Sequence, residues 1–185
     1  MKQAFILQPF EPDDLLLSIV GGASIAIDGF VEYQQGLLEL HYSLRGDLTQ
    51  VLFPAAVNSP ERKFALWEAT CLEFFVAIVG HADYWEFNLA PNGNWQVFHL
   101  NDYREGLKDE AAINYLPFVV KQDTQELQLD LSIDLTCLFP PDTKLEMAIT
   151  AVIQAATSEY NYWAVKHGGE EADFHHRADF VIKLD

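Results

Sequence analysis

The strongest constraint on the fold is a turn signal, Asn92-Gly93, that separates two short segments rich in aromatic residues. Residues Tyr84–Leu89 precede the signal, and residues Trp95–Leu100 follow it. Asparagine and glycine both tolerate a positive φ angle, which the tight connections of β-hairpins require. The sequence therefore predicts a β-hairpin over these two segments.

The segment just upstream, Leu72–Val79, is apolar on both faces except for Glu73. Strands that are buried on both faces have such continuous apolar runs, so we expect a central strand here. Residues 38–44 and 127–133 instead alternate apolar and polar side chains with a period of two, which indicates half-exposed strands.

About ten short segments of these two kinds follow one another with turn residues between them, and no long amphipathic helix interrupts them. This organisation predicts an all-β fold, a single-domain antiparallel β-sandwich of jelly-roll type. No linker or low-complexity run divides the chain, so one domain is expected over residues 1–185. Ser59-Pro60-Glu61 is the one short helix start that we predict, with serine as the cap and proline in the first turn.

The formal net charge of −17, from 28 acidic and 11 basic side chains, excludes whole classes of partner. Nucleic acids and anionic membrane surfaces are both bound through clustered lysine and arginine, so neither is an expected partner. Neutral ligands, cationic ligands and divalent metals remain open. The N-terminal residues lack the apolar run of a secretory signal, and no apolar segment has the length of a membrane span, so the expected location is cytoplasmic.

Three polar residues on the aromatic strands are candidates for ligand binding. Glu73 shares a strand face with Cys71 and Phe75, and a carboxylate in such a place needs either a partner within the fold or a ligand. Glu86 and Asn88 share one face of the next strand, where they either add contacts to the same ligand or lie on a solvated face.

Two tryptophans, Trp67 and Trp163, lie beside loops at strand ends, where an aromatic plane suits stacking on a sugar ring. The alternative for each is ordinary core packing, which is the favoured interpretation for Trp85 and Trp95 beside the hairpin. A loop that contains His167, His175 and His176 together with carboxylates is expected to be a polar loop rather than a metal site, because no His-Glu-X-X-His spacing occurs.

The combined motifs resemble the bacterial DOMON-like proteins, which are related to family 9 carbohydrate-binding modules. The residues that carry the resemblance are Leu66-Trp67-Glu68-X-Thr70-Cys71-X-Glu73-X-Phe75, Tyr84-Trp85-Glu86-Phe87-Asn88-Leu89-X-Pro91-X-Gly93-X-Trp95, Tyr103-Arg104-Glu105-Gly106, Tyr162-Trp163-Ala164-Val165-Lys166-His167 and Asp173-Phe174-His175-His176. The resemblance extends from about Leu38 to Phe180 and implies a jelly-roll sandwich that binds a ligand without catalysis.

In family 9 modules, two tryptophans hold the terminal sugar and a glutamate on the following strand bonds its hydroxyls. The resemblance places Trp67, Trp163 and Glu73 in these roles and adds Arg104 as a further candidate. It implies a carbohydrate or a small polar ligand as the partner. It also implies a structural calcium ion, for which the sequence assigns no ligands; no other cofactor is expected.

Two other functions remain open at this stage. Glu73 and Glu86 would serve a glycoside hydrolase if both faced one cleft, because such enzymes place two carboxyl groups across the scissile bond. A scaffold or interaction module without a small ligand would instead bury Trp67 and Trp163 in the core, with no pocket between them. No nucleophile, phosphate-loop or dinucleotide motif occurs in the sequence.

Overall fold

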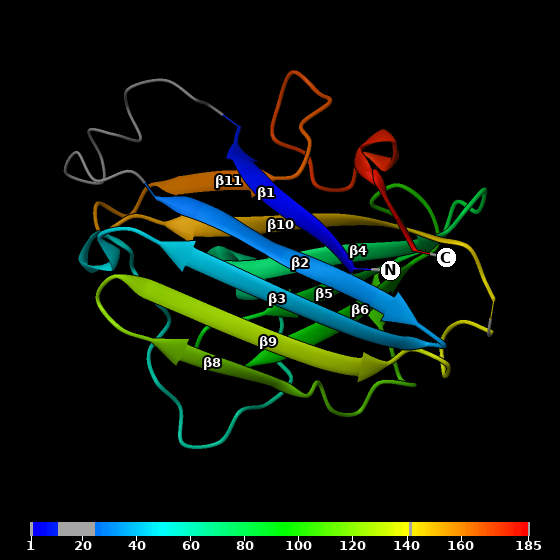
Figure 1. The fold of residues 1–185 in the computed structure, drawn as a ribbon, viewed down its shortest axis with the longest axis horizontal. Coiled ribbons are helices and arrows are strands. Elements are labelled where there is room, and N and C mark those ends of the chain that lie inside the picture. The colour runs from blue at the N-terminus through cyan, green and yellow to red at the C-terminus, as the bar shows by residue number, and fades with distance from the viewer. Residues whose placement is uncertain (1, 11–24, 141, 185) are drawn as a thin grey trace.

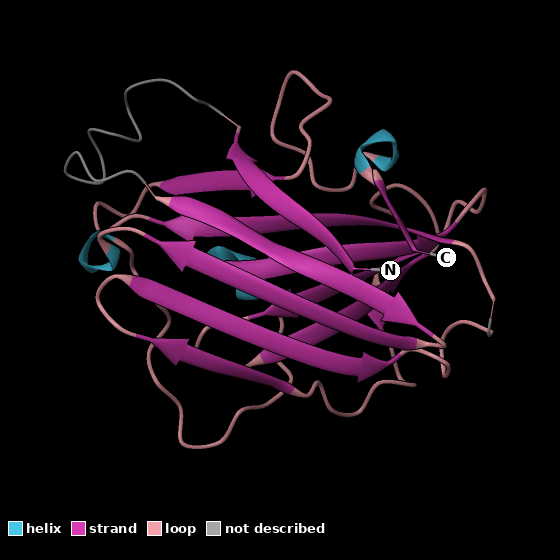
Figure 2. Ribbon diagram, viewed as in Figure 1, coloured by secondary structure: helices cyan, strands magenta, loops and turns pink. Residues whose placement is uncertain are grey.

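The computed structural model describes residues 2–10, 25–140 and 142–184 of the chain. Strands dominate this part of the molecule (Figure 2), together with the short 3₁₀ turns η1 (Leu48–Gln50), η2 (Leu66–Glu68) and η3 (Arg177–Asp179). The strands are β1 (Lys2–Pro9), β2 (Ala26–Gln34), β3 (Leu37–Arg45), β4 (Cys71–Ile78), β5 (Tyr84–Leu89), β6 (Trp95–Leu100), β7 (Lys108–Asp109), β8 (Phe118–Gln122), β9 (Glu126–Asp134), β10 (Leu145–Gln154), β11 (Tyr160–Ala164) and β12 (Ile182–Leu184). No helix among the described residues is long and apolar enough to cross a membrane.

The strands form one antiparallel sheet that curls back on itself into two facing layers. The strand order is β7-β6-β5-β4-β10-β11-β1-β2-β3-β9-β8, and β12 pairs with β10. Strand β1 joins the layers, because residues 2–7 pair with β2 whereas Gln8 and Pro9 pair with β11. In Figure 1, β2, β3 and β9 cross in front of β4, β5 and β6, so we call β1, β2, β3, β9 and β8 the front half and the other strands the back half. The predicted all-β antiparallel fold is confirmed, and its jelly-roll type stays a prediction.

The main hydrophobic core fills the space between the two halves. On β3 the alternating residues Leu40 and Tyr42 face this core, as the period of two predicts. On the back half, Phe74 of β4 stacks on Phe87 of β5, with ring centroids 4.4 Å apart and planes 10° apart. Each such buried side chain stabilises the fold by roughly 1.5–3 kcal/mol, so these contacts hold the halves together.

The back half also buries much of its other face, which is turned away from the front half. Phe75, Tyr84, Phe98 and Phe180 form a second, smaller hydrophobic cluster there. This second cluster explains why β4 is apolar on both faces, as the sequence predicts, and β4 does lie centrally between β5 and β10. We refer to this surface as the outer face of the back half.

The predicted hairpin is confirmed, because β5 and β6 pair from Tyr84 opposite Leu100 to Leu89 opposite Trp95. Its connection, residues 90–94, is longer than a two-residue turn. Gly93 takes the positive φ angle (94°), and a side chain there would lie 2.7 Å from Pro60 Cγ. Glycine is therefore required at this position both by its conformation and by the close approach of Pro60.

The predicted helix start at Ser59-Pro60-Glu61 is wrong, because these residues have no helical conformation and the next turn along the chain, η2, begins only at Leu66. The physical reason is the anchoring of Arg62 along β6. Its guanidinium donates to the backbone oxygens of Val97 (3.2 Å) and Glu110 (3.0 Å) and lies over the ring of Trp95. These contacts hold the segment in an extended conformation against the sheet. A helix at Ser59-Pro60-Glu61 would break them.

Candidate functional site

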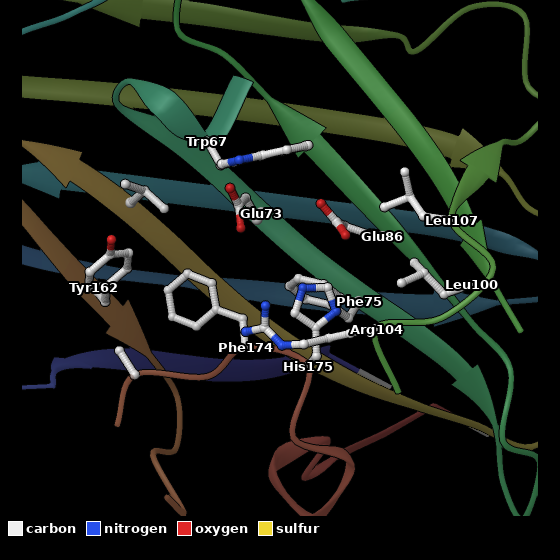
Figure 3. A pocket seen from close by; sticks show the side chains of 12 residues that line it. Trp67, Glu73, Phe75, Glu86, Leu100, Arg104, Leu107, Tyr162, Phe174 and His175 are labelled. Atoms are coloured by element: carbon white, nitrogen blue, oxygen red, sulfur yellow. The ribbon is translucent and has the colours of Figure 1, made fainter. Parts of the chain in front are cut away.

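A cavity of about 420 Å³ lies on the outer face of the back half. This volume falls within the range of about 300–1,000 Å³ that is typical of small-molecule sites. Aromatic, acidic and basic side chains all take part in its wall (Figure 3). The lining residues are Trp67, Glu73, Phe75, Glu86, Leu100, Arg104, Leu107, Val152, Tyr162, Ala172, Phe174 and His175.

The two glutamates of the cavity come from the neighbouring strands β4 and β5. In the register of these strands Glu73 lies opposite Asn88, and Phe75 lies opposite Glu86. Residues directly opposite each other share a face of the sheet, so Glu73 and Glu86 are diagonal neighbours on one face. Such diagonal positions are about 7–8 Å apart, within reach of a single small ligand.

Glu73 is a buried carboxyl group without a complete set of partners. Its residue is 3% exposed, and among the described residues its Oε1 atom has no hydrogen-bond partner. Burial, and then the nearby charge of Glu86, raise the pKa of Glu73 well above its usual value. The side chain therefore presents an unsatisfied oxygen to the cavity, and an unsatisfied buried polar atom lowers stability unless something bonds it.

Glu86 is also buried, at 4% exposed, but it has one neutral partner. The side-chain amide of Asn88 donates a hydrogen bond of 2.8 Å to Glu86 Oε1. Burial raises the pKa of Glu86 to about 7, although the bond from Asn88 and the charge of Arg104 act in the opposite direction. Near neutral pH, Glu86 therefore exchanges between its charged and neutral forms.

Aromatic side chains stand around the two carboxyl groups. In Figure 3, Glu73 and Glu86 lie between Trp67 on one side and Phe174 on the other. The ring of Tyr162 meets that of Phe174 edge to face, at a centroid distance of 5.9 Å. The cavity thus combines apolar ring faces with hydrogen-bonding carboxyl groups at its centre.

Arg104 and His175 line the cavity as basic residues but are bonded to other groups. The Arg104 guanidinium donates to Asp173 Oδ1 (2.8 Å), and the Arg104 backbone N–H donates to the hydroxyl of Tyr84 (3.1 Å). That hydroxyl lies 2.8 Å from His175 Nδ1. Burial, and then the charge of Arg104, lower the pKa of His175 to about 4, so the imidazole is neutral near pH 7 and shares a hydrogen bond with the tyrosine hydroxyl through Nδ1.

Four of the six residues predicted for the site line this one cavity, and two do not. Trp67, Glu73, Glu86 and Arg104 are brought together. Asn88 is fully buried beneath them, where it bonds Glu86 instead of facing the cavity. It is therefore a supporting residue for the carboxyl group next to it.

Trp163 does not form the expected pair with Trp67. It is 6% exposed and belongs to the main core between the halves, on the face of β11 opposite to the cavity. The preceding residue, Tyr162, lines the cavity in its place. Successive side chains of a strand point to opposite faces, so a shift of one residue exchanges the site for the core.

Sequence reasoning predicted four of the twelve residues of the cavity wall, and the aromatic residues Tyr162, Phe174 and His175 are among those that it missed. Alternation within β11 was a usable signal for Tyr162, because Tyr160 and Tyr162 share its more exposed face. Phe174 and His175 come from a loop, whose course no periodicity predicts.

The histidine-rich loop does not gather its imidazoles around a common point. His167 Nε2 lies 2.9 Å from the backbone oxygen of Gln8, and His176 Nδ1 lies 3.1 Å from Asp179 Oδ2, whereas His175 faces Tyr84. Within the described residues, no group of three or more His, Cys, Asp or Glu side chains is arranged to hold a metal ion.

Comparison with known proteins places the chain by its fold. No protein-family model matches the sequence, and no curated protein sequence matches it. The structure is similar to that of a protein from Bacteroides uniformis ATCC 8492 to which carbohydrate binding is attributed. The TM-score is 0.66 at 16% sequence identity, over 95% of this chain and 84% of that one.

Two structures of a family 9 carbohydrate-binding module from Caldicellulosiruptor kristjanssonii align less closely. The complex with cellotriose gives a TM-score of 0.49 at 9% identity, over 88% of this chain and 71% of that one. The complex with glucose gives 0.44 at 10% identity, over 83% of this chain and 78% of that one. The likeness that carries weight is therefore the one to the Bacteroides protein, and it concerns the fold.

Proposed function

We propose that this chain is a non-catalytic binding protein that holds a carbohydrate, or a small polar ligand of similar shape, in the outer-face cavity. The observation that carries the proposal is the unsatisfied Oε1 atom of Glu73 within a ring of aromatic side chains. The carbohydrate binding attributed to the similar Bacteroides protein supports it.

The chemistry of a sugar ring matches the two kinds of surface in the cavity. A pyranose has apolar C–H faces and an equatorial belt of hydroxyl groups, so it stacks on aromatic planes while its hydroxyls bond polar groups at its edge. Trp67 and Phe174 supply the planes, and Glu73 and Glu86 lie between them. Hydrogen bonds from a ligand would satisfy the carboxyl oxygen that the fold leaves without a partner.

The test is a glycan-array and metabolite screen with the full chain, followed by isothermal titration of each hit. We expect saturable binding that falls by about tenfold or more in Trp67→Ala and in Glu73→Gln, because each removes a contact worth on the order of 1 kcal/mol or more. Thermal unfolding of both variants checks that the fold is retained.

Two surface variants provide matched controls. Tyr115→Ala removes an aromatic ring that is 71% exposed, and Glu39→Gln removes an exposed carboxylate of the front half. Neither residue lines the outer-face cavity, so both variants should bind as the wild type does. Unchanged affinity in Trp67→Ala and Glu73→Gln, measured on folded protein, would contradict the proposal.

One observation favours a second function, carboxylate-dependent glycoside hydrolysis. Glu73 and Glu86 face the same cavity, as that function requires. They are diagonal neighbours on one face of the sheet, so both carboxyl groups can reach one glycosidic bond. Release of nitrophenol from a panel of nitrophenyl glycosides, abolished in Glu86→Gln, would establish hydrolysis. The binding proposal predicts no turnover with any of them.

A further inference from the structure

Within the described residues, neither carboxyl group of the outer-face cavity is bonded to a basic side chain, the partner that buried acids usually have. Glu86 is bonded by the neutral amide of Asn88, and Glu73 Oε1 is unpartnered among the described residues. The basic residues of the cavity wall are engaged elsewhere, Arg104 with Asp173 and His175 with Tyr84. Two acids that are 3% and 4% exposed thus share one cavity without a bonded cation.

Burial of a carboxylate is unfavourable unless an opposite charge or several hydrogen bonds compensate it. A sugar hydroxyl supplies a hydrogen bond but no charge. An ammonium group supplies both, and it is also attracted to the faces of aromatic rings, of which tryptophan is the best. Trp67, Phe174 and Tyr162 stand around the acids. The aromatic rings and carboxyl groups of the cavity therefore suit an organic cation as well as a sugar ring.

We infer that the ligand carries a protonated amine, and that the carboxyl pair of Glu73 and Glu86 selects an amino sugar over the corresponding neutral sugar. This inference rests on the proposed function, because the aromatic walls are taken to hold the ring. The amine takes the place of the missing basic partner. The net charge of −17 acts in the same direction by attracting cationic ligands.

Proton release accompanies such binding. Burial raises the pKa of Glu86 to about 7 and that of Glu73 well above its usual value, so much of the pair is neutral near pH 7 before the ligand arrives. A bound ammonium favours the ionised forms and lowers both pKa values. Binding of the amine therefore expels protons, and the affinity rises as the pH rises toward neutrality.

Other groups that face the pair modulate this titration without reversing it. Arg104 lowers the pKa of Glu86, and His175, with its pKa of about 4, stays neutral through the range. Burial, and then the charge of Glu73, raise the pKa of Cys71, so its thiol stays protonated. Other ionisable side chains near the pair in the described part of the chain include Tyr42, Tyr84, Tyr162 and Asp173.

The experiment compares ligands that differ only in one substituent. Chitosan oligomers, chitin oligomers and cello-oligosaccharides carry an amine, an acetamide and a hydroxyl at the same ring position, and galactosamine, N-acetylgalactosamine and galactose form a second set. Each is titrated calorimetrically into the full chain at about pH 4.5, 5.5 and 6.5, below the pKa of roughly 7.7–8.0 of an α-amino group, which the amine of an amino sugar resembles more than that of lysine. Two buffers of different ionisation enthalpy report the protons released.

We expect the amine form of at least one set to bind about tenfold or more tighter than its two counterparts at about pH 6.5, where the amine is still protonated, since a charge-assisted bond replaces a neutral one. This preference should shrink toward about pH 4.5 as the carboxyl groups are protonated, with net proton release on binding. Glu86→Gln should weaken the amine form about tenfold more than the hydroxyl form. Glu39→Gln, on the front half, should leave both affinities unchanged.

The outcomes separate this inference from the proposed function. If the hydroxyl or acetamide form binds as tightly as the amine, or no proton is released, the amine inference is wrong and carbohydrate binding stands. If no sugar in the panel or on the glycan array binds, both fall. Glu73→Gln serves as the second variant if Glu86→Gln does not fold, and its affinity ratio must change in the same direction.

Discussion

The two faces of strand β4 belong to the same eight residues and yet have opposite chemistry. Phe74 faces the main hydrophobic core between the halves, where it stacks on Phe87 of the neighbouring strand β5. Its neighbour Glu73 faces the outer cavity with an unsatisfied oxygen. The inner face is arranged for stability alone. The outer face keeps two buried acids that lower stability, which is the pattern expected where a site has been retained for a ligand.

The largest effect is expected from truncating the tryptophan of the inner face. Trp163→Ala should lower the free energy of unfolding by roughly 3–5 kcal/mol, because it leaves a cavity in the core. Trp67→Ala, at the half-exposed mouth of the site, should cost about 1 kcal/mol or less and act on ligand affinity instead. Urea unfolding of both variants measures the contrast.

Trp163→Phe sharpens this comparison as a control. The indole Nε1 of Trp163 has no hydrogen-bond partner among the described residues, so phenylalanine loses volume but no bond. Its cost should be well below that of Trp163→Ala. Equal destabilisation by Trp67→Ala and Trp163→Ala would mean that both rings are core, and the distinction between the faces would fail.

The second prediction concerns the pH dependence of the acids on the outer face. Glu86 has a pKa of about 7 in the folded chain against an ordinary value of 4.5, so the folded state binds more protons than the unfolded state between these values. Stability from this group is present at low pH and is lost as the pH rises through about 7, by on the order of 3 kcal/mol. Glu86→Gln should therefore gain stability relative to the wild type over this range.

The wild type alone would hide the effect, because His175 acts in the opposite direction. Its pKa of about 4, against 6.5 ordinarily, means that the folded state binds fewer protons between these values, so its contribution rises with pH. The free energy of unfolding of the wild type and of Glu86→Gln is therefore measured at several pH values. The difference between the two proteins cancels the contribution of His175, which both share. A difference that does not change with pH would show that Glu86 is not held in a dehydrated place.

The third prediction tests the hydrogen bond that Asn88 donates to Glu86. Asn88→Ala removes the donor to Glu86 Oε1 from a fully buried position. A cost of roughly 1–3 kcal/mol is expected, because a buried acceptor loses its bond. The pKa of Glu86 should also rise above about 7, which carbon-13 NMR of its carboxyl group measures. An unchanged pKa would show that the amide does not stabilise the ionised form.

The smallest effect on stability is expected at the rim of the cavity. Arg104→Ala breaks the pair with Asp173, but the arginine side chain is 51% exposed, so the loss should stay below about 1 kcal/mol. The pKa of His175 should rise, because the charge of Arg104 is one of the two causes that lower it. Proton NMR of the imidazole measures this pKa. An unchanged pKa of His175 would show that the charge of Arg104 does not act on it.

The sequence predicted the strands well because their signals are local. Alternation located β3 and β9, the apolar run located β4, and Asn92-Gly93 located the hairpin. The helix start at Ser59-Pro60-Glu61 was wrong because contacts of Arg62 with β6, far along the chain, override a local capping pattern.

The site was only partly predictable for the same reason. Glu73 and Glu86 follow from strand alternation, since the hairpin fixes which residues share a face. The choice between Tyr162 and Trp163 depends on which face of β11 meets the core, and alternation indicates it only once Tyr160 is paired with Tyr162 on the outer face. Phe174 and His175 reach the cavity through a loop, where tertiary packing alone decides the course of the chain.

The double pairing of β1 has a consequence for how the protein folds. Gln8 and Pro9 pair with β11, whereas the rest of β1 pairs with nearby β2. Contacts between segments so distant in sequence close large loops and form late in folding, so the seam between the halves is expected to be among the last parts to form. Tyr162 is positioned instead by the local pairing of β11 with β10, so its place in the cavity wall does not depend on that seam.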